Sequence, residues 1–411
     1  MDSFKAFFKL PRTIYILFAA RIINSIGSFV YPLLTILLTA KLGFSNEVAG
    51  RIITIAISVG GIGMLLGGRL ADRIGRKKIL VLSSLLGAIA FIICAFMGTS
   101  RDIVYIIIAG NFFSIAQWPT VNAMVTDTTT KETRQSAFSL LYLGTNIGVA
   151  VGPLLAGFLI NSHLKLFFLL DAITTIVSLI PVIIFVKDTL PSKEAIESIG
   201  EKDTERAEKG TVFRALLKRP ILLIFTFVSV IYSLIYAQYT FGIPLFVNDI
   251  FGNTNGPKIY GTLMSVNAVQ VILMTLFIIG FTKRIKPIIN ISIAGLLFAF
   301  GFGMLYFSKY LYLFVISTVT WTLGEIVLTV NSNVFIANNS PITHRGRFNA
   351  VISFIQESGF ALAPLLTGIF MAHLGIKNIW PIIFGLSVIG ALMMFFLFVA
   401  EKARNKKEST T

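Results

Sequence analysis

Histidine and cysteine are scarce in this chain, which has three histidines and one cysteine among 411 residues. A single cysteine cannot form an intrachain disulfide, and Cys94 falls inside an apolar run, where it fits as a small core residue. The sequence contains no His/Cys cluster with metal-ligand spacing, no phosphate-binding loop and no nucleophile–base arrangement. We therefore expect no metal, no cofactor and no enzymatic activity.

Charged residues are also few, at 13% of the chain, although their sum is a net charge of +16. In a soluble chain such basicity would suggest nucleic-acid binding. Here the mean hydropathy is +0.83, and runs of about 20 apolar residues recur along the whole length. Such a run crosses the ~30 Å hydrocarbon core as a helix. The composition predicts an all-α polytopic membrane protein that contacts the lipid bilayer and no nucleic acid.

Twelve transmembrane helices are predicted from these runs. They cover residues 13–40, 46–68, 79–98, 103–126, 136–162, 166–186, 221–247, 259–281, 288–307, 311–338, 348–372 and 378–399. Both termini and alternate loops then share one side, which carries 27 of the 35 lysines and arginines. The positive-inside rule makes that side, and both termini, cytoplasmic. We expect a multi-pass protein of the cell membrane, in particular the cytoplasmic membrane of a bacterium.

The chain divides into two related halves. The polar segment 188–218 predicts a cytoplasmic linker between a six-helix bundle at 1–187 and another at 219–400, followed by a cytoplasmic tail at 401–411. A constant offset of 211 residues pairs Arg134 with Arg345 and Pro153 with Pro364. Two parallel membrane repeats are a transporter architecture, so we expect pseudo-symmetric bundles and a functional monomer.

The segment "GGRLADRIGRKK" at 67–78 concentrates charge between the second and third predicted helices. It resembles the G-x-L-a-D-r-x-G-r-k loop that the major facilitator superfamily has at this place. The matching residues are Gly68, Leu70, Asp72, Arg73, Gly75, Arg76 and Lys77. The resemblance implies that superfamily's fold and a gating loop, in which Asp72 accepts hydrogen bonds at a neighbouring helix N-terminus. The alternative is a loop that only orients the protein in the membrane.

A second segment, "GVAVGPLLAG", lies in the fifth predicted helix. It is similar to a glycine–proline pattern enriched in the drug–proton antiporters of the same superfamily. The matching residues are Gly148, Gly152, Pro153 and Gly157. Small residues spaced by four permit close helix contacts, so packing alone is the alternative. The fourth predicted helix lacks an arginine found there in many proton-coupled members, which argues against any mechanism that requires it.

Polar and aromatic side chains follow single faces of several predicted helices, at spacings of three or four. The resemblance implies that the first, fourth, seventh and tenth helices line a substrate cavity. The candidate cavity residues are Arg21, Asn24, Trp118, Asn122, Tyr142, Asn146, Tyr236, Tyr239 and Trp321. Interhelical hydrogen bonding that only holds the bundle together is the alternative reading of these stripes.

Three acids are candidates for proton coupling: Glu325, Glu357 and Asp127. Glu325 stands in the middle of the tenth predicted helix, where the ionised form of a carboxyl group is costly. Such a group binds a proton more readily than an exposed acid, so it can exchange a proton near neutral pH. The alternative for Glu325 is a permanently protonated structural acid. Glu357 is also mid-helix, and either pairs with Arg21 or bonds a neighbouring helix. Asp127 lies at a helix end, where solvation or contact with the gating loop competes with proton transfer.

These features favour a proton-coupled antiporter that exports lipophilic or amphipathic compounds. Its two halves would rock by alternating access, with protons and a small-molecule substrate competing at Glu325. An alternative is proton-coupled or facilitated transport of a polar metabolite such as a sugar, bound by Arg21, Asn24, Gln117 and Asn122. Transport of a lipid is a third possibility, because an apolar cavity suits both kinds of cargo.

Overall fold

The computed structural model describes residues 10–190, 220–339 and 345–408, and every regular element in these ranges is helical. The expected all-α class therefore holds for the described part of the chain. The predicted linker at 188–218 lies almost wholly outside the described residues, and so do the last three residues of the predicted tail.

The helices follow the predicted apolar runs closely. Before the predicted linker they are α2 (Arg12–Gly27), α3 (Leu34–Ile36), the π-helical turn η1 (Leu37–Lys41), α4 (Asn46–Ile74), α5 (Arg76–Met97), α6 (Ile103–Ala116), α7 (Trp118–Thr128), α8 (Lys131–Ser162) and α9 (Leu164–Phe185). After it they are α12 (Pro220–Tyr236), η2 (Ala237–Tyr239), α13 (Gly242–Thr282), α14 (Pro287–Gly303), η3 (Met304–Phe307), α15 (Leu311–Asn339), α16 (Arg345–Leu374), η5 (Ile376–Asn378) and α17 (Ile379–Glu408).

Ten helical segments of the described residues are long and apolar enough to cross a membrane. This number differs from the predicted twelve at two places. The first predicted helix is interrupted after Gly27, so that α2 has only 16 residues. The segment Pro220–Thr275 continues as one 56-residue candidate across the seventh predicted helix and into the eighth, with non-helical backbone at Gly252.

The interruption of the first helix has a local and a distant cause. Pro32 has no backbone N–H and cannot continue the helical hydrogen-bond ladder. Two backbone donors just beyond the end of α2 are satisfied by Asp171 of α9, whose Oδ2 accepts hydrogen bonds from the N–H groups of Phe29 (2.9 Å) and Val30 (3.0 Å). Asp171 is buried, and so are both residues that it binds. Asp171 therefore fixes the path of the chain between α2 and α3.

The helices form two compact units. Unit 1 contains the described residues of Met1–Gly200 and Val247–Ile272, and unit 2 contains those of Glu201–Phe246 and Leu273–Thr411. The segment Val247–Ile272 belongs with unit 1 because it packs closely against α8: the Asn161 amide donates hydrogen bonds to the carbonyl oxygens of Asn253 and Thr254, both at 2.9 Å. The predicted division into six and six helices remains a prediction.

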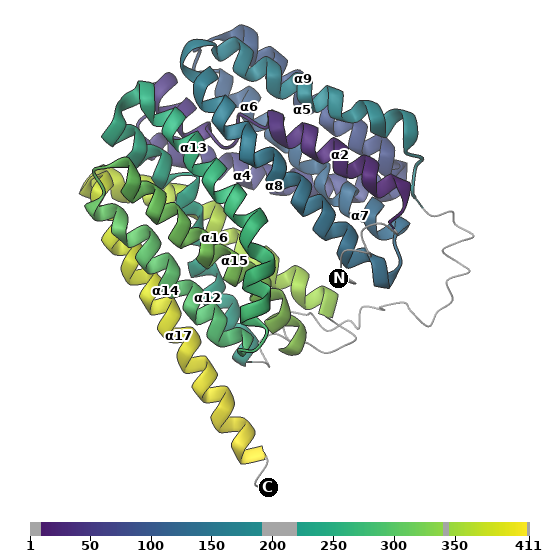
Figure 1. The fold of residues 1–411 in the computed structure, drawn as a ribbon. Coiled ribbons are helices and arrows are strands. Elements are labelled where there is room, and N and C mark those ends of the chain that lie inside the picture. The colour runs from purple at the N-terminus through teal and green to yellow at the C-terminus, as the bar shows by residue number, and fades with distance from the viewer. Residues whose placement is uncertain (1–9, 191–219, 340–344, 409–411) are drawn as a thin grey trace. The chain divides into compact units, whose positions relative to one another are not determined.

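Each unit has its own packed interior. In unit 1, α2 lies along α8 and α9, and α5 packs on α6 and α9 (Figure 1). In unit 2, α14 contacts both α15 and α17, and α12 lies on α16. Aromatic rings fill the unit 2 interior, where Phe302 stacks on Trp321 (5.7 Å between centroids) and on Trp380 (6.4 Å). This packing fixes the positions of the helices that line the cavities described next.

Candidate functional site

Unit 1 contains a partly open cavity of about 420 Å³ that is lined mainly by α2, α7, α8 and α9. Its lining residues are Leu17, Ala20, Arg21, Asn24, Leu80, Gln117, Trp118, Val121, Asn122, Phe138, Leu141, Tyr142, Thr145, Ser178, Leu179 and Val182. Most of this surface is apolar, and a few amides and hydroxyls interrupt it. The volume falls within the usual range for small-molecule sites.

Arg21 is the cation of this cavity, and two side chains position its guanidinium. Its Nε donates a hydrogen bond to Thr145 Oγ1 on α8 at 2.8 Å. The guanidinium carbon also lies 5.1 Å from the ring centroid of Trp118 on α7, within the range of a cation–π contact. The lining residues include no aspartate or glutamate, and Arg21 forms no ion pair with a described carboxylate of unit 1; the suggested pairing with Glu357 of unit 2 stays a prediction.

Five predicted cavity residues line this space: Arg21, Asn24, Trp118, Asn122 and Tyr142. Asn24 also donates a hydrogen bond to Thr175 Oγ1 on α9 at 3.0 Å, so it both faces the cavity and joins two helices. Asn146 lies elsewhere: its amide donates to the Tyr142 carbonyl one turn earlier on α8, and it does not line the cavity.

Unit 2 contains a smaller pocket of about 240 Å³. Its lining residues are Ser229, Tyr232, Ser233, Tyr236, Phe298, Glu325, Leu328, Thr329, Ser332, Gln356 and Glu357. The structure therefore brings together two of the three acids singled out from the sequence, although they are 32 positions apart on α15 and α16. The lining contains hydroxyls, an amide and two carboxyl groups but no lysine or arginine, which is the reverse of the unit 1 cavity.

The aromatic residues predicted for unit 2 have two different environments. Tyr236 lines the pocket, with its ring centroid 4.7 Å from that of Tyr239. Tyr239 stacks on Trp321 (5.9 Å), and neither of these two lines the pocket. Trp321 is 0% exposed, because its face on α15 turns into the aromatic interior. The helical spacing singled out three aromatic residues that contact one another, but it could not separate the core from a cavity.

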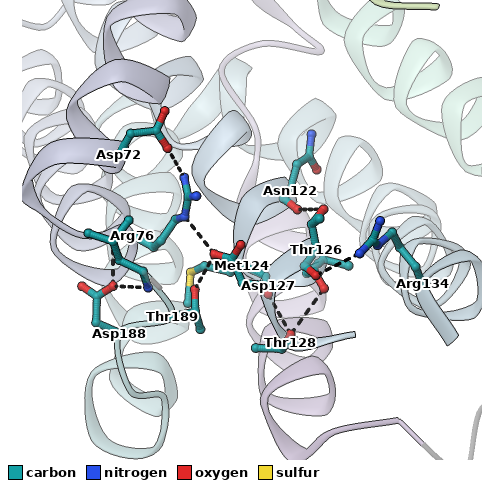
Figure 2. A network of polar contacts seen from close by, with 12 residues as sticks. Asp72, Arg76, Asn122, Met124, Thr126, Asp127, Thr128, Arg134, Asp188 and Thr189 are labelled. Carbon is teal, nitrogen blue, oxygen red and sulfur yellow. Dashed lines mark hydrogen bonds and ion pairs between the residues drawn. The ribbon is translucent and has the colours of Figure 1, made fainter. Parts of the chain in front are cut away.

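The predicted gating loop forms a network at the end of α4 and the start of α5 (Figure 2). Arg76 joins two acids: its Nη1 bonds Asp72 at 2.5 Å, and its Nε bonds Asp127 of α7 at 2.9 Å. Asp127 also accepts a hydrogen bond from Thr189 Oγ1 at 3.2 Å. Asp127, a candidate for proton coupling, is thus held by Arg76 as the competing interpretation expected.

The acid that binds the N-terminus of α5 is not part of the motif. Asp188, beyond α9, accepts a hydrogen bond from the backbone N–H of Arg76 at 3.0 Å, at the first residue of α5. Asp72 has no such bond among the described residues and pairs with Arg76, four positions along. Gly75 joins the two helices with φ at +122°, a conformation that glycine adopts without strain.

The remaining motif residues support the same junction. Lys77 donates a hydrogen bond to the Ile183 carbonyl at 2.7 Å, which ties α5 to the end of α9. Arg73 is in the last turn of α4, where a cation complements the helix dipole. Gly68, also on α4, faces Pro119 of α7: a Cβ there would lie 3.6 Å from the Pro119 side chain.

The glycine–proline segment of α8 packs against two neighbouring chain segments. Gly148 and Gly152 face α2, and a Cβ at Gly152 would lie 2.8 Å from the Ile26 carbonyl oxygen. Gly157 faces α13 at Pro257, and Pro153 stands between these two contacts inside α8. The segment thus provides close backbone approach on both sides, as the small-residue spacing indicated.

Several residues at these sites were not expected from the sequence. They are Asp188 and Thr189 in the loop network, Thr145 beside Arg21, and Ser229, Ser233 and Gln356 in the unit 2 pocket. Asp188 carries a detectable signal, because it is an acid directly after a membrane-length helix and beside the basic loop. The hydroxyl residues carry none, since isolated serines and threonines are common in such helices.

Comparison with known proteins gives consistent matches over most of the chain. A family model described as Major Facilitator Superfamily matches residues 17–356 and 256–411. The MFS-type transporter YqjV of Bacillus subtilis (strain 168) is 24% identical over 388 residues, covering 92% of each chain. A Na⁺, Li⁺, K⁺/H⁺ antiporter of Planococcus maritimus is 24% identical, covering 82% of this chain and 84% of its own. The crystal structure of a POT family transporter with a thioalcohol-conjugated peptide superposes with a TM-score of 0.77 at 15% identity, covering 95% of this chain and 96% of its own.

Proposed function

Because this chain belongs to the Major Facilitator Superfamily of transporters, we propose that it exports lipophilic or amphipathic compounds in exchange for protons. The mechanism is alternating access by a monomer in the cytoplasmic membrane of a bacterium, with both termini in the cytoplasm and no bound cofactor. The observation that carries the proposal is the pairing of Glu325 and Glu357 in one pocket that has no cation among its lining residues.

Two carboxyl groups in such a pocket favour proton binding. Each ionised carboxylate at membrane depth costs about 2.5–3.5 kcal/mol on insertion scales, and two in one pocket also repel each other. A proton on either group removes one charge and that repulsion together. Ser233 and Thr329 also line the pocket, and a hydroxyl can donate a hydrogen bond to a carboxylate or accept one from a protonated carboxyl group.

The proposed cycle uses Glu325 as the exchanging acid and Glu357 as its partner. Protonation of Glu325 on the outer side releases the cargo, and loss of the proton to the cytoplasm restores the form that binds cargo. The two states of the carrier then differ in affinity for both ligands, which is the requirement for coupling. Asp127, held by Arg76, has no part in this proton path.

Two further observations support proton antiport. The relative from Planococcus maritimus is named as a cation/proton antiporter, and it matches along most of both chains. The glycine–proline segment of α8, similar to the drug–proton antiporter pattern, packs closely on both of its sides. The mostly apolar cavity of unit 1 favours an amphipathic cargo over a sugar, which needs many polar partners.

The test uses proteoliposomes with an acid interior and a pH-sensitive dye. Lipophilic cations, amphipathic anions and sugars are added one at a time to wild type, Glu325→Gln and Glu47→Gln. Glu47 is the matched control, because it is ion-paired with Arg51 at the start of α4 and lies outside both pockets. We expect cargo-dependent proton release in wild type and Glu47→Gln, and none in Glu325→Gln. Normal counterflow of a sugar without proton movement for any compound would contradict the proposal.

A further inference from the structure

We propose that the cargo is an amphipathic organic anion whose carboxylate binds Arg21 in the unit 1 cavity. The inference rests on the proposed transport function for its biological meaning and names the substrate class. Its basis is the guanidinium of Arg21, which Thr145 and Trp118 position but whose positive charge neither of them balances.

The contacts of Arg21 leave its terminal nitrogens available. Nε donates its hydrogen bond to Thr145, and the guanidinium lies over the ring of Trp118. Nη1 and Nη2 donate no hydrogen bond to a described residue, and neither is among the fully buried polar atoms without a partner, so both keep some accessible surface. Two parallel N–H groups on one guanidinium match the two oxygens of a carboxylate.

The charge of the cavity is unbalanced without a ligand. Arg21 is the one side chain with a permanent charge among the lining residues, and it lies within the first predicted transmembrane helix, residues 13–40. The buried acid of the neighbouring helix α9, Asp171, bonds the Phe29 and Val30 amides. A cation confined at membrane depth without a counter-charge is costly, so a bound anion supplies the missing partner.

The rest of the lining specifies the body of the cargo. Trp118, Phe138 and Tyr142 are each more than a third exposed and offer aromatic faces, and Leu17, Val121 and Leu179 complete an apolar wall. Gln117 adds polarity at one point: its Oε1 accepts from Ser84 at 2.8 Å, which leaves its amide N–H groups as donors. Donors from Arg21 and Gln117 in a lining that is otherwise mostly apolar fit an anionic head with a flat or aliphatic body.

Other cargo classes fit this cavity less well. A lipophilic cation would meet the like charge of Arg21, which costs affinity in a site of low dielectric constant. A sugar would leave most of its hydroxyls against apolar side chains, and unpaired polar groups are costly to bury. The organic anion satisfies both the charge and the apolar wall.

Binding of three ligands with the same naphthalene body tests the proposal. They are 1-naphthaleneacetate, 1-naphthaleneacetamide and 1-naphthylmethylammonium, with charges of −1, 0 and +1; 1-naphthyl phosphate tests a different anion. Affinities are measured by titration calorimetry on the full chain in lipid nanodiscs, with no pH gradient. We expect the carboxylate to bind tighter than the other three, by about tenfold to a hundredfold over the neutral amide.

Variants of two arginines on α2 make the test specific. Arg21→Gln should abolish the preference for the carboxylate, and Arg21→Lys should keep only part of it, because an ammonium lacks the paired donors. Arg12→Gln is the control: Arg12 also makes a cation–π contact, with Phe185 at 5.3 Å, but is exposed and outside the cavity. If Arg21→Gln fails to fold, an unchanged carboxylate affinity in Arg21→Lys would overturn the inference.

Equal affinities for the charged and neutral ligands, tighter binding of the phosphate, or failure of the carboxylate to bind would also overturn it. The outcome is separable from that of the proposed function. Arg21-dependent binding of the carboxylate without proton exchange in proteoliposomes supports this inference and contradicts the antiport. Proton release with a lipophilic cation, without binding of the carboxylate, supports the antiport and contradicts this inference.

Discussion

Gly157 of α8 lies against the backbone carbonyl of Pro257 in α13 with no room for a side chain between them. A Cβ at Gly157 would overlap the Pro257 oxygen and lie 2.9 Å from its carbonyl carbon. The contact is reciprocal, since a Cβ at Gly261 of α13 would lie 2.9 Å from the carbonyl carbon of Pro153 in α8. Each segment therefore presents a glycine to a proline carbonyl of the other.

This contact predicts that Gly157→Ala is destabilising despite the higher helix propensity of alanine. The added methyl group must separate α8 from α13, and overpacking of this kind typically costs about 1–3 kcal/mol. Gly61→Ala on α4 is the control, because a Cβ there meets nothing within 4 Å. Thermal unfolding in detergent should show a lower midpoint for Gly157→Ala only. Equal midpoints for the two variants would mean that α8 and α13 can move apart without loss of stability.

The two acids that bind Arg76 should differ in their contribution to stability. The side chains of Arg76 and Asp127 are each 14% exposed, whereas that of Asp72 is 63% exposed. A solvated pair contributes about 0–1 kcal/mol, and a hydrogen bond to a charged group that is shielded from water about 1.5–3 kcal/mol. Asp127→Asn should therefore lower the unfolding midpoint more than Asp72→Asn. The opposite order would show that the exposed motif acid has a further partner.

Asp171 should be required for the structure of the interrupted first helix. Asp171→Ala leaves the N–H groups of Phe29 and Val30 buried without acceptors, at a cost of about 2–6 kcal/mol for the two. Asp171→Asn keeps one acceptor oxygen and should cost less. Unfolding midpoints measure both variants, with the exposed Asp102→Asn as control. A full loss of stability in Asp171→Asn would instead indicate that the negative charge itself is needed.

Trp321 should behave as a core residue and not as a cargo contact. Its ring is fully buried against Phe302, and its Nε1 has no hydrogen-bond partner among the described residues. Trp321→Ala should cost about 3–5 kcal/mol of stability, whereas Trp321→Phe removes the unsatisfied N–H and should cost little. The affinity for cargo should be unchanged in Trp321→Phe. A selective loss of cargo affinity with unchanged stability would show that Trp321 contacts the cargo.

Local sequence patterns predicted the helices and the side chains that share one helix face. The spacing of Arg21 and Asn24 was sufficient to place both on one face of α2, and that face meets the cavity. The motif spacing likewise located the junction of α4 and α5, because the glycine and the charges act within a few residues of one another.

Relationships between distant residues were beyond those patterns. The interruption after Gly27 depends on Asp171, which is 142 positions from Phe29. The acid at the start of α5 is Asp188, which is 112 positions from Arg76. The stripe containing Trp321 could not show which of its residues meet packed rings and which meet space, because that depends on side chains from other helices.

The unbalanced charge of Arg21 has an electrical consequence. In the proposed exchange, outward movement of a monoanion and inward movement of one proton each make the cell interior more positive by one elementary charge, so a one-for-one exchange transfers two elementary charges. Each charge that crosses a potential of 100 mV gains about 2.3 kcal/mol. Such a carrier would draw on the membrane voltage as well as the pH gradient, and it would continue to work when the two sides have equal pH.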